Sequence, residues 1–192
     1  MNGFDFTTAV AAVCRDMTRR VPELGHIDMD RVAVGFCQAR KRGKYGVQAT
    51  LTPMRFERGA ETKRVRGRTY GCSRLFDAQG REQLYLLNFY LPRFQDGPLE
   101  EKLTTVVHEL WHISAEFDGD LRRHAGRCYA HGSSQKKFDE HAARLAREWL
   151  AADPPPGLWA FLELSFDDLV AEHGTVRGAR YRAPKLVRLD AA

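Results

Sequence analysis

The spacing of hydrophobic and polar residues predicts that the chain opens with an amphipathic helix. Between residues 5 and 20, apolar side chains recur every three or four positions, which places them on one side of a helix. Thr7 or Thr8 can cap the start of this helix, and Pro22 ends it. The apolar side is formed by Val10, Val13, Cys14 and Met17.

Three later stretches have the alternating, β-branched pattern that is typical of strands. Residues 31–39 and 46–57 flank the turn-like segment RKRGKYG, so they predict a hairpin. Residues 82–92 are mostly apolar and predict a third strand, which follows a turn around Gly80. The segment RAPKLVRL, near the end of the chain, predicts a short final strand.

The helical period returns between residues 99 and 117. Pro98 suits the start of this helix, and an acidic pair at residues 100 and 101 suits the positive end of its dipole. The apolar face holds Leu103, Val106, Val107, Leu110, Trp111 and Ile113. The polar face, which the apolar residues leave uncovered, holds Glu101, Thr105, His108, Glu109, His112 and Glu116.

A polar loop then leads to another helix over residues 134–153, which Ser133 or Ser134 can cap. Further along, the segment SFDDLVAEHG has the spacing of a capping box and ends in a glycine, so it predicts a short helix. Strands followed by helices indicate the α+β class, with a small mixed β-sheet packed on the N-terminal helix. We expect residues 1–152 to form the domain and residues 153–192 to form a C-terminal extension packed on it.

The composition is that of a globular protein. The chain has 192 residues, 43% of them hydrophobic, which suits one domain with a sizeable core. It shows neither a run of eighteen apolar residues nor a secretory leader, so we expect a cytoplasmic protein without a membrane segment. The four cysteines are far apart in the sequence, which favours reduced thiols: Cys14, Cys37, Cys72 and Cys128.

The chain is basic, with 30 Lys and Arg against 25 Asp and Glu and a net charge of +5. Much of the excess lies between residues 40 and 68. Such a stripe attracts phosphate groups and makes nucleic acid a candidate partner, although a solvated surface is the alternative. The candidate nucleic-acid-binding residues are Arg40, Lys41, Arg42, Lys44, Lys63, Arg64, Arg66 and Arg68.

Residues 108–112 have the sequence HELWH, an H-E-x-x-H motif on the predicted helix 99–117. His108 and His112 are one helical turn apart, so one imidazole nitrogen of each can bind the same Zn²⁺ ion. Glu109 is on the same polar face and can take a proton from zinc-bound water, then pass it to a leaving amine. The alternative is that the three side chains are only solvated.

A catalytic zinc ion usually takes three protein ligands, so one more ligand is needed. Spacing favours His131, which comes just before the second helix, and leaves His124 and Glu140 as alternatives. Stabilising the oxyanion of peptide hydrolysis also needs a hydrogen-bond donor near the metal. Tyr129 is the favoured candidate for this role, with Arg127 and His124 as the other candidates.

With these residues in view, the chain resembles the SprT-like zinc metallopeptidases, and in particular a bacterial and phage-type group of HExxH zincins. The likeness covers the order of elements over roughly residues 5–152, together with HELWH and the His-Gly pair at residues 131 and 132. It implies a zincin-like fold, in which the motif helix is followed by a second active-site helix. It also implies zinc as cofactor, peptide hydrolysis with Glu109 as general base, and His131 as third ligand.

The chain departs from the family pattern in two places. The aromatic residue after the His-Gly pair comes late, at Phe138, and the zinc ribbon often found downstream is missing. Two functions therefore follow from the sequence. One is a metallopeptidase, a hydrolase that acts on proteins or peptides, and the other is a zinc-containing module of the same fold that binds nucleic acid without proteolysis.

Overall fold

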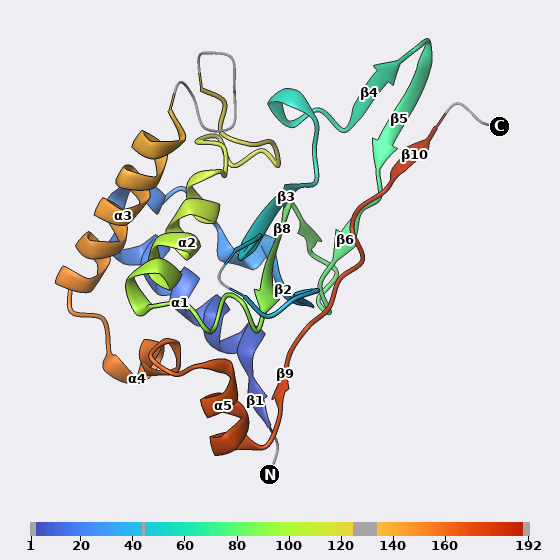
Figure 1. The fold of residues 1–192 in the computed structure, drawn as a ribbon. Coiled ribbons are helices and arrows are strands. Elements are labelled where there is room, and N and C mark those ends of the chain that lie inside the picture. The colour runs from blue at the N-terminus through green and yellow to red at the C-terminus, as the bar shows by residue number, and fades with distance from the viewer. Residues whose placement is uncertain (1–2, 44, 125–133, 190–192) are drawn as a thin grey trace.

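After an N-terminal helix, the chain forms a series of short strands and then a series of helices, as Figure 1 shows for the computed structural model. The structure describes residues 3–43, 45–124 and 134–189. The helices are α1 (Phe6–Arg20), α2 (Leu99–Trp111), α3 (Gln135–Ala151), α4 (Pro156–Trp159) and α5 (Phe166–His173). The strands are β1 (Phe4–Asp5), β2 (Val32–Gln38), β3 (Ala49–Pro53), β4 (Thr62–Val65), β5 (Arg68–Cys72), β6 (Leu75–Phe76), β7 (Glu82–Gln83), β8 (Tyr85–Leu91), β9 (Val176–Arg177) and β10 (Leu186–Arg188). These elements form one small domain of the α+β class.

The main sheet has the strand order β2-β8-β3. β2 runs parallel to β8, whereas β3 runs antiparallel to it. Every residue of β8 except Tyr90 is buried, and a strand that is apolar on both faces is most stable at the centre of a sheet. The predicted hairpin between residues 31–39 and 46–57 is therefore wrong, because β8 separates β2 from β3.

The apolar residues predicted for α1 are all completely buried, and they meet the core that also packs on α2 and the main sheet. The predicted cap of α1 is wrong by a few residues. Asp5 caps the helix, because its carboxylate accepts a hydrogen bond of 3.0 Å from the Thr8 N–H. The Thr7 hydroxyl donates to the same carboxylate at 3.2 Å, so both predicted caps bind the cap residue instead.

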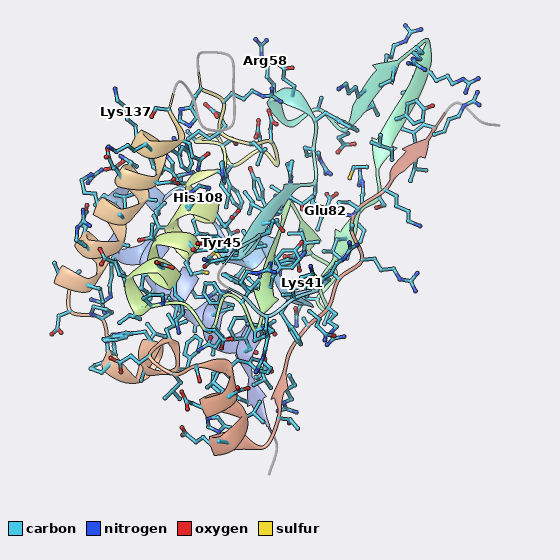
Figure 2. All side chains as sticks on the ribbon, viewed as in Figure 1. Lys41, Tyr45, Arg58, Glu82, His108 and Lys137 are labelled. Atoms are coloured by element: carbon cyan, nitrogen blue, oxygen red, sulfur yellow. The ribbon has the colours of Figure 1, made fainter. Side chains whose placement is uncertain are left out.

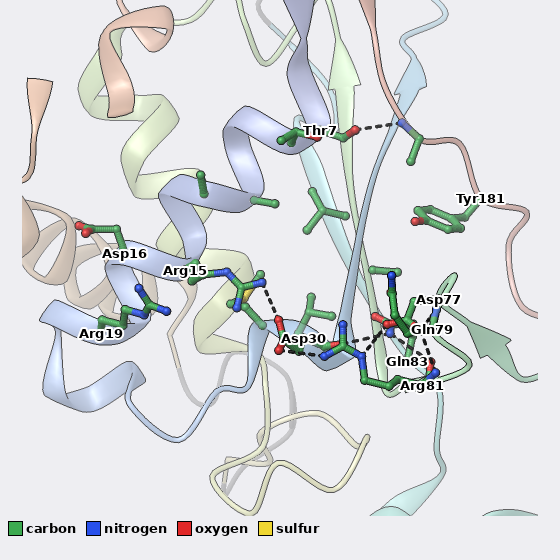
Figure 3. Close-up of a pocket in the computed structure, with 18 of the residues that line it drawn as sticks. Thr7, Arg15, Asp16, Arg19, Asp30, Asp77, Gln79, Arg81, Gln83 and Tyr181 are labelled. Carbon is green, nitrogen blue, oxygen red and sulfur yellow. Dashed lines mark hydrogen bonds and ion pairs between the residues drawn. The ribbon is translucent and has the colours of Figure 1, made fainter. Parts of the chain in front are cut away.

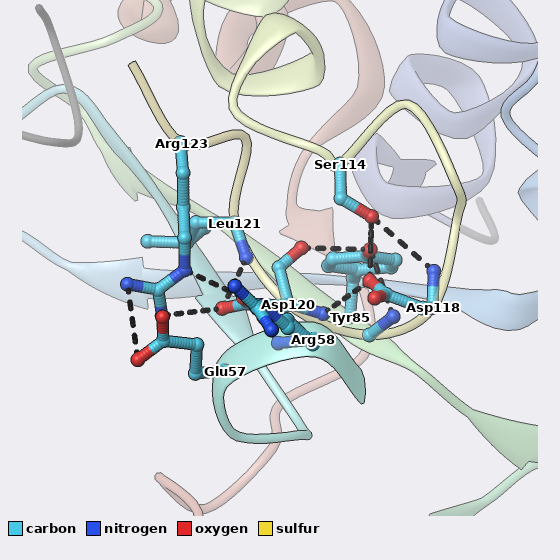
Figure 4. Close-up of polar contacts among 9 residues, drawn as sticks. Glu57, Arg58, Tyr85, Ser114, Asp118, Asp120, Leu121 and Arg123 are labelled. Carbon is cyan, nitrogen blue, oxygen red and sulfur yellow. Dashed lines mark hydrogen bonds and ion pairs between the residues drawn. The ribbon is translucent and has the colours of Figure 1, made fainter. Parts of the chain in front are cut away.

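α2 ends at Trp111, six residues earlier than the periodicity predicts. The residues that follow α2 form a loop around the buried side chain of Tyr85, and Figure 4 shows the polar contacts that hold this loop. The Tyr85 hydroxyl donates to the Asp120 carbonyl and accepts from the Gly119 N–H, both at 2.9 Å. The Ser114 hydroxyl donates to Asp118 Oδ1 at 2.6 Å. The backbone N–H and C=O groups of this segment thus find hydrogen-bond partners outside a helix, so the helix can end at Trp111.

The later elements agree better with the sequence. Ser134 caps α3, the capping box of Ser165 and Asp168 begins α5, and a residue of positive φ, Gly174, ends it. Two buried side chains connect the chain after α4 to the body. The Gln95 amide donates to the Phe161 and Leu164 carbonyls at 2.7 Å, and Lys102 Nζ donates to Leu164 at 3.0 Å. The final strand is confirmed as β10.

β4 and β5 form a hairpin that the hydrophobic pattern did not reveal, and β10 pairs with β5 on the other side. The turn is made by Arg66 and Gly67, both with positive φ, as two-residue hairpins require. Figure 1 shows this hairpin projecting from the body of the molecule. β4 is exposed along its whole length, and Gly71 is the one buried residue of β5, so the hairpin has no buried apolar face that a hydrophobic pattern could report.

A cleft of about 880 Å³ lies beside α1 and the edge strand β2. Ion pairs cross its floor, as Figure 3 shows: Asp30 contacts Arg15 at 2.8 Å and Arg81 at 2.9 Å, and Arg81 also contacts Asp77 at 2.8 Å. The pairs join α1 to the turn between β6 and β7, which contains the predicted Gly80. These charged side chains of the cleft are therefore paired with one another, and the pairs connect α1 to the β6–β7 turn.

Candidate metal centre

His108 and His112 face each other at the end of α2, with their Nε2 atoms 3.1 Å apart. His112 is the residue that follows the helix, but its φ of −69° and ψ of −17° continue the helical turn. Two nitrogen ligands of one tetrahedral zinc ion are about 3.3 Å apart, because each lies 2.0–2.1 Å from the metal. The pair therefore has the spacing of two zinc ligands, a spacing that an N–H···N hydrogen bond also permits.

Asp139, in the second turn of α3, determines how His108 presents its ring. Its Oδ1 atom lies 2.9 Å from His108 Nδ1, and Gln135 Nε2 donates to the same oxygen at 3.0 Å. Since an ionised carboxylate only accepts, Nδ1 must carry the proton, and the lone pair of His108 is then on Nε2, facing His112. A carboxylate in this position is typical of metal-binding histidines.

Phe138 packs against the same rings and is 5% exposed. Its ring is stacked on His112 at 4.8 Å and meets His108 edge-on at 4.8 Å. Phe138, the aromatic residue that follows the His-Gly pair later than in the SprT-like family, thus packs directly on the two histidine rings. Neither Phe138 nor Asp139 was assigned to the site from the sequence, because their position depends on how α3 packs against α2.

Glu109 is buried beside the pair, with 8% of its surface exposed. Burial raises the pKa of its carboxyl to about 7, and a backbone hydrogen bond from Leu51 in β3 acts in the opposite direction. His112 is also 8% exposed. The polar face of α2, expected to be uncovered, is therefore covered at the motif by α3 and by the edge strand β3.

A cleft of about 900 Å³ gives access to the motif. It runs between the start of β3, the first turns of α2 and the start of α3, and Figure 2 labels His108 in this region. The His108 side chain remains 19% exposed, so the pair can be reached from solvent. The residues that line the cleft nearest to the motif are Gln48, Glu101, Thr105, His108, Glu109 and Asp139.

Within residues 3–43, 45–124 and 134–189, no group of three or more His, Cys, Asp or Glu side chains is placed to hold a metal ion. The favoured third ligand, His131, lies outside the described residues. So do Tyr129, Arg127 and Cys128. Of the three predicted zinc ligands, the structure therefore describes His108 and His112 but not His131.

The alternative ligands are both described. Glu140 is 62% exposed and pairs with Lys136 at 3.8 Å, so the structure does not bring its carboxylate to the histidine pair. His124 contacts the Phe138 ring edge-on at 5.8 Å, so the aromatic ring lies against both His124 and the pair. Neither residue completes a three-ligand group with His108 and His112.

The basic stripe of residues 40–68 is not one surface. Arg42 forms a two-point ion pair with Asp167 of α5, and the Lys41 carbonyl accepts from Arg93 at 3.0 Å, so this loop packs on the body. Arg40 is exposed in the same loop, and Lys44 lies outside the described residues. The other four cations, Lys63, Arg64, Arg66 and Arg68, belong to the projecting β4–β5 hairpin.

Comparison of the chain with models of protein families, with curated proteins and with solved structures finds no match. Among the described helices, none is both long and apolar enough to cross a membrane. The cysteines at positions 14, 37 and 72 are free thiols, as predicted, whereas Cys128 is not described. The functional interpretation therefore depends on the geometry of the histidine pair and its neighbours.

Proposed function

We propose that the protein is a zinc-dependent metallopeptidase of the zincin type, as its resemblance to the SprT-like enzymes implies. The observation that carries this proposal is the 3.1 Å separation of the two Nε2 atoms beside a buried glutamate. The surroundings support it, because an edge strand, β3, flanks the motif helix on one side and α3 packs on the other. These neighbours support the zincin-like fold that the resemblance implies.

His108 and His112 would hold the metal, with His131 as the third ligand. Chain length supports His131: it is three residues before Ser134, the cap of α3, and three residues span at most about 10 Å. The helix that Ser134 begins already places Phe138 and Asp139 against the pair. The short distance along the chain between His131 and this helix therefore supports His131 as the proposed third ligand.

The proposed reaction divides between the metal and the side chains of the protein. When bound, zinc would supply a Lewis acid that activates water and polarises the scissile carbonyl. The Glu109 carboxylate would accept a proton from the attacking water and donate it to the nitrogen of the leaving amine. Its burial keeps competing water away from that proton. Tyr129 is proposed as the donor to the oxyanion, and the 900 Å³ cleft would hold a short segment of the protein or peptide substrate.

The test is the substitution Glu109→Gln in the whole protein. We expect zinc content, measured by elemental analysis, to stay near one ion per chain, because the ligands are intact. Hydrolysis of a fluorescently labelled, unfolded protein substrate should fall by roughly 10²- to 10⁴-fold, the usual contribution of a general base.

The matched control is Glu140→Gln, which makes the same change at an exposed position on α3. This variant should retain both zinc and activity. Absence of stoichiometric zinc in the wild-type protein, or undiminished hydrolysis by Glu109→Gln, would refute the proposal.

A further inference from the structure

β2 is an edge strand of the main sheet, because it pairs with β8 on one side only. In a strand, the N–H and C=O of one residue point to the same side, and those of the next residue point to the other side. The Arg31 carbonyl accepts from the Leu84 N–H at 2.8 Å, and the Ala39 N–H donates to the Leu91 carbonyl at 2.7 Å. The odd-numbered residues of β2 therefore face β8, and the even-numbered residues face the outer edge.

The outer edge is covered at one end and open at the other. The Phe36 N–H donates to the Ala179 carbonyl at 3.0 Å, where the chain after β9 crosses this edge. Val32 and Val34 face the same way, but within the described residues the N–H and C=O of Val34 have no hydrogen-bond partner. Val34 is only 8% exposed, and nearly all buried backbone groups in folded proteins are paired. A further strand would supply the missing partners.

The open edge borders the cleft of about 880 Å³ beside α1. Val32, Ala33 and Val34 all line this cleft, although their side chains alternate between the two faces of the sheet. What the three residues share is the outer edge of the strand. Figure 3 shows the two ends of the cleft, with the hydrogen bond of Thr7 to the tail at one end and the ion pairs of Asp30 at the other. The edge between these ends is open to the cleft.

The walls of the cleft suit the side chains of an extended strand. On the α1 side, the small residues Ala11 and Ala12 leave the space open. The lining also contains two aromatic rings: Tyr181, which packs beside Ala33 on the outer face of the sheet, and Phe76, which is 52% exposed. A strand in the cleft would turn alternate side chains toward α1 and toward Tyr181. The charged residues at one end already form ion pairs, so apolar side chains at alternate positions fit best.

We propose that β2 binds a short extended segment of another protein, which adds a fourth strand to the main sheet. The segment would donate to the Val32 and Val34 carbonyls and accept from the Val34 N–H, so its backbone would supply much of the affinity. The edge from Val32 to Phe36 is about 13 Å long, at roughly 3.3 Å per residue, which suits about four residues. Since β3 forms the opposite edge of the sheet, beside the motif, this segment docks the partner and is not the segment that is cleaved.

Amide hydrogen exchange of the whole protein tests the open edge without a partner. Followed by NMR, the Val34 N–H should exchange about tenfold faster than the N–H groups of Ala33 and Gly35, because these two face β8. Equal protection of the three amides would show that the edge is already paired, and it would overturn the proposal.

The binding experiment uses a random library of peptides of about twelve residues, displayed on phage, and the whole protein as bait. We expect enrichment of peptides with apolar residues at alternate positions, and anisotropy of a labelled synthetic copy then measures affinity. N-methylation of single amides should weaken binding about tenfold at alternate positions, whose N–H faces β2, and much less at the positions between them. Bound peptide should also slow exchange of the Val34 N–H about tenfold.

Ala12→Gln should weaken peptide binding about tenfold, because the longer side chain enters the cleft. Ala171→Gln makes the same change at an exposed position of α5, so it is the matched control and should keep full affinity. Circular dichroism of each variant checks that the helices remain folded. Absence of any enriched peptide, N-methyl effects that do not alternate, or equal affinity of Ala12→Gln and the wild type would each overturn the proposal.

Discussion

At the residue scale, Asp139 determines the chemical state of the histidine pair. Its carboxylate accepts a hydrogen bond from His108 Nδ1–H at 2.9 Å, so the lone pair of the neutral ring is on Nε2, the atom that lies 3.1 Å from His112 Nε2. Gln135 in turn holds the carboxylate at 3.0 Å. The His108 ring is thus oriented by the protein itself, which would lower the reorganisation needed for the proposed zinc binding.

This orientation can be tested by Asp139→Ala. We expect zinc affinity to fall by roughly 10- to 100-fold, because the ring of His108 loses both its fixed tautomer and the basicity that the carboxylate provides. Competition with a fluorescent zinc chelator measures the change. Glu140→Ala, one residue along the same helix and 62% exposed, should leave the affinity unaltered. Equal zinc affinity of Asp139→Ala and the wild type would show that the contact does not orient the ligand.

At the scale of elements, a buried lysine connects α2 to the chain that follows α4. Lys102 is 1% exposed, and its Nζ donates to the Gln95 carbonyl at 2.6 Å and to the Leu164 carbonyl at 3.0 Å. Burial lowers the pKa of Lys102 to about 8. The ammonium group is therefore costly to bury, while its hydrogen bonds hold the two segments together.

The sign of the pH dependence follows from that pKa. Below pH 8, Lys102 is protonated in both the folded and the unfolded states, and the full cost of burial is present. Between pH 8 and the unfolded value of 10.5, only the unfolded chain keeps the proton, so this residue's contribution to stability rises with pH. Relative to Lys102→Met, the wild type should gain about 3 kcal/mol across this range.

Urea unfolding at pH 7.5 and at pH 10.5 measures this difference directly. The comparison between variants matters because burial also raises the pKa of the Cys14 thiol to about 12, which acts in the opposite direction in both proteins. Lys137→Met, at an exposed position of α3, should keep the pH dependence of the wild type. Parallel pH profiles for Lys102→Met and the wild type would contradict the burial argument.

What the sequence could predict depended on whether the signal was local. α1, α2, α3 and α5 were predicted because apolar spacing and capping signals lie within one segment, as for Ser134 and for the capping box at Ser165, whereas α4 was not predicted. The order of the main sheet was not found, since β8 enters between two strands that precede it in the chain. The β4–β5 hairpin was missed because β4 is exposed along its whole length and β5 has no buried apolar residue. In the same way, the local H-E-x-x-H spacing predicted that His108 and His112 lie side by side, but the contact with Asp139 depends on the packing of α3 on α2.

At the scale of the whole molecule, opposite charges gather at two separate places. Residues 62–74 and 176–189 contain ten Lys and Arg residues and no Asp or Glu, whereas the described lining of the motif cleft contains four carboxylates and no lysine or arginine. Two of these carboxylates, Glu109 and Asp139, belong to the site, and Glu100 pairs with Arg147 at 3.4 Å. Glu101 has no ion pair within the described residues. The lining of the cleft is thus acidic, whereas residues 62–74 and 176–189 are basic.

If the cleft binds the substrate of the proposed peptidase, peptides with a basic residue beside the scissile bond should be preferred. We expect kcat/KM to be roughly two- to five-fold higher for lysine than for glutamine at the best position, since one exposed charge pair contributes at most about 1 kcal/mol. The preference should fall as salt screens the charges, and Glu101→Gln should remove it.

Glu172→Gln, at a 61% exposed position in α5, is the control and should retain the preference for lysine. A peptide set with lysine or glutamine at one position at a time measures both effects. A lysine preference that survives high salt or Glu101→Gln would mean that side-chain shape, rather than the charge of the cleft, selects the substrate.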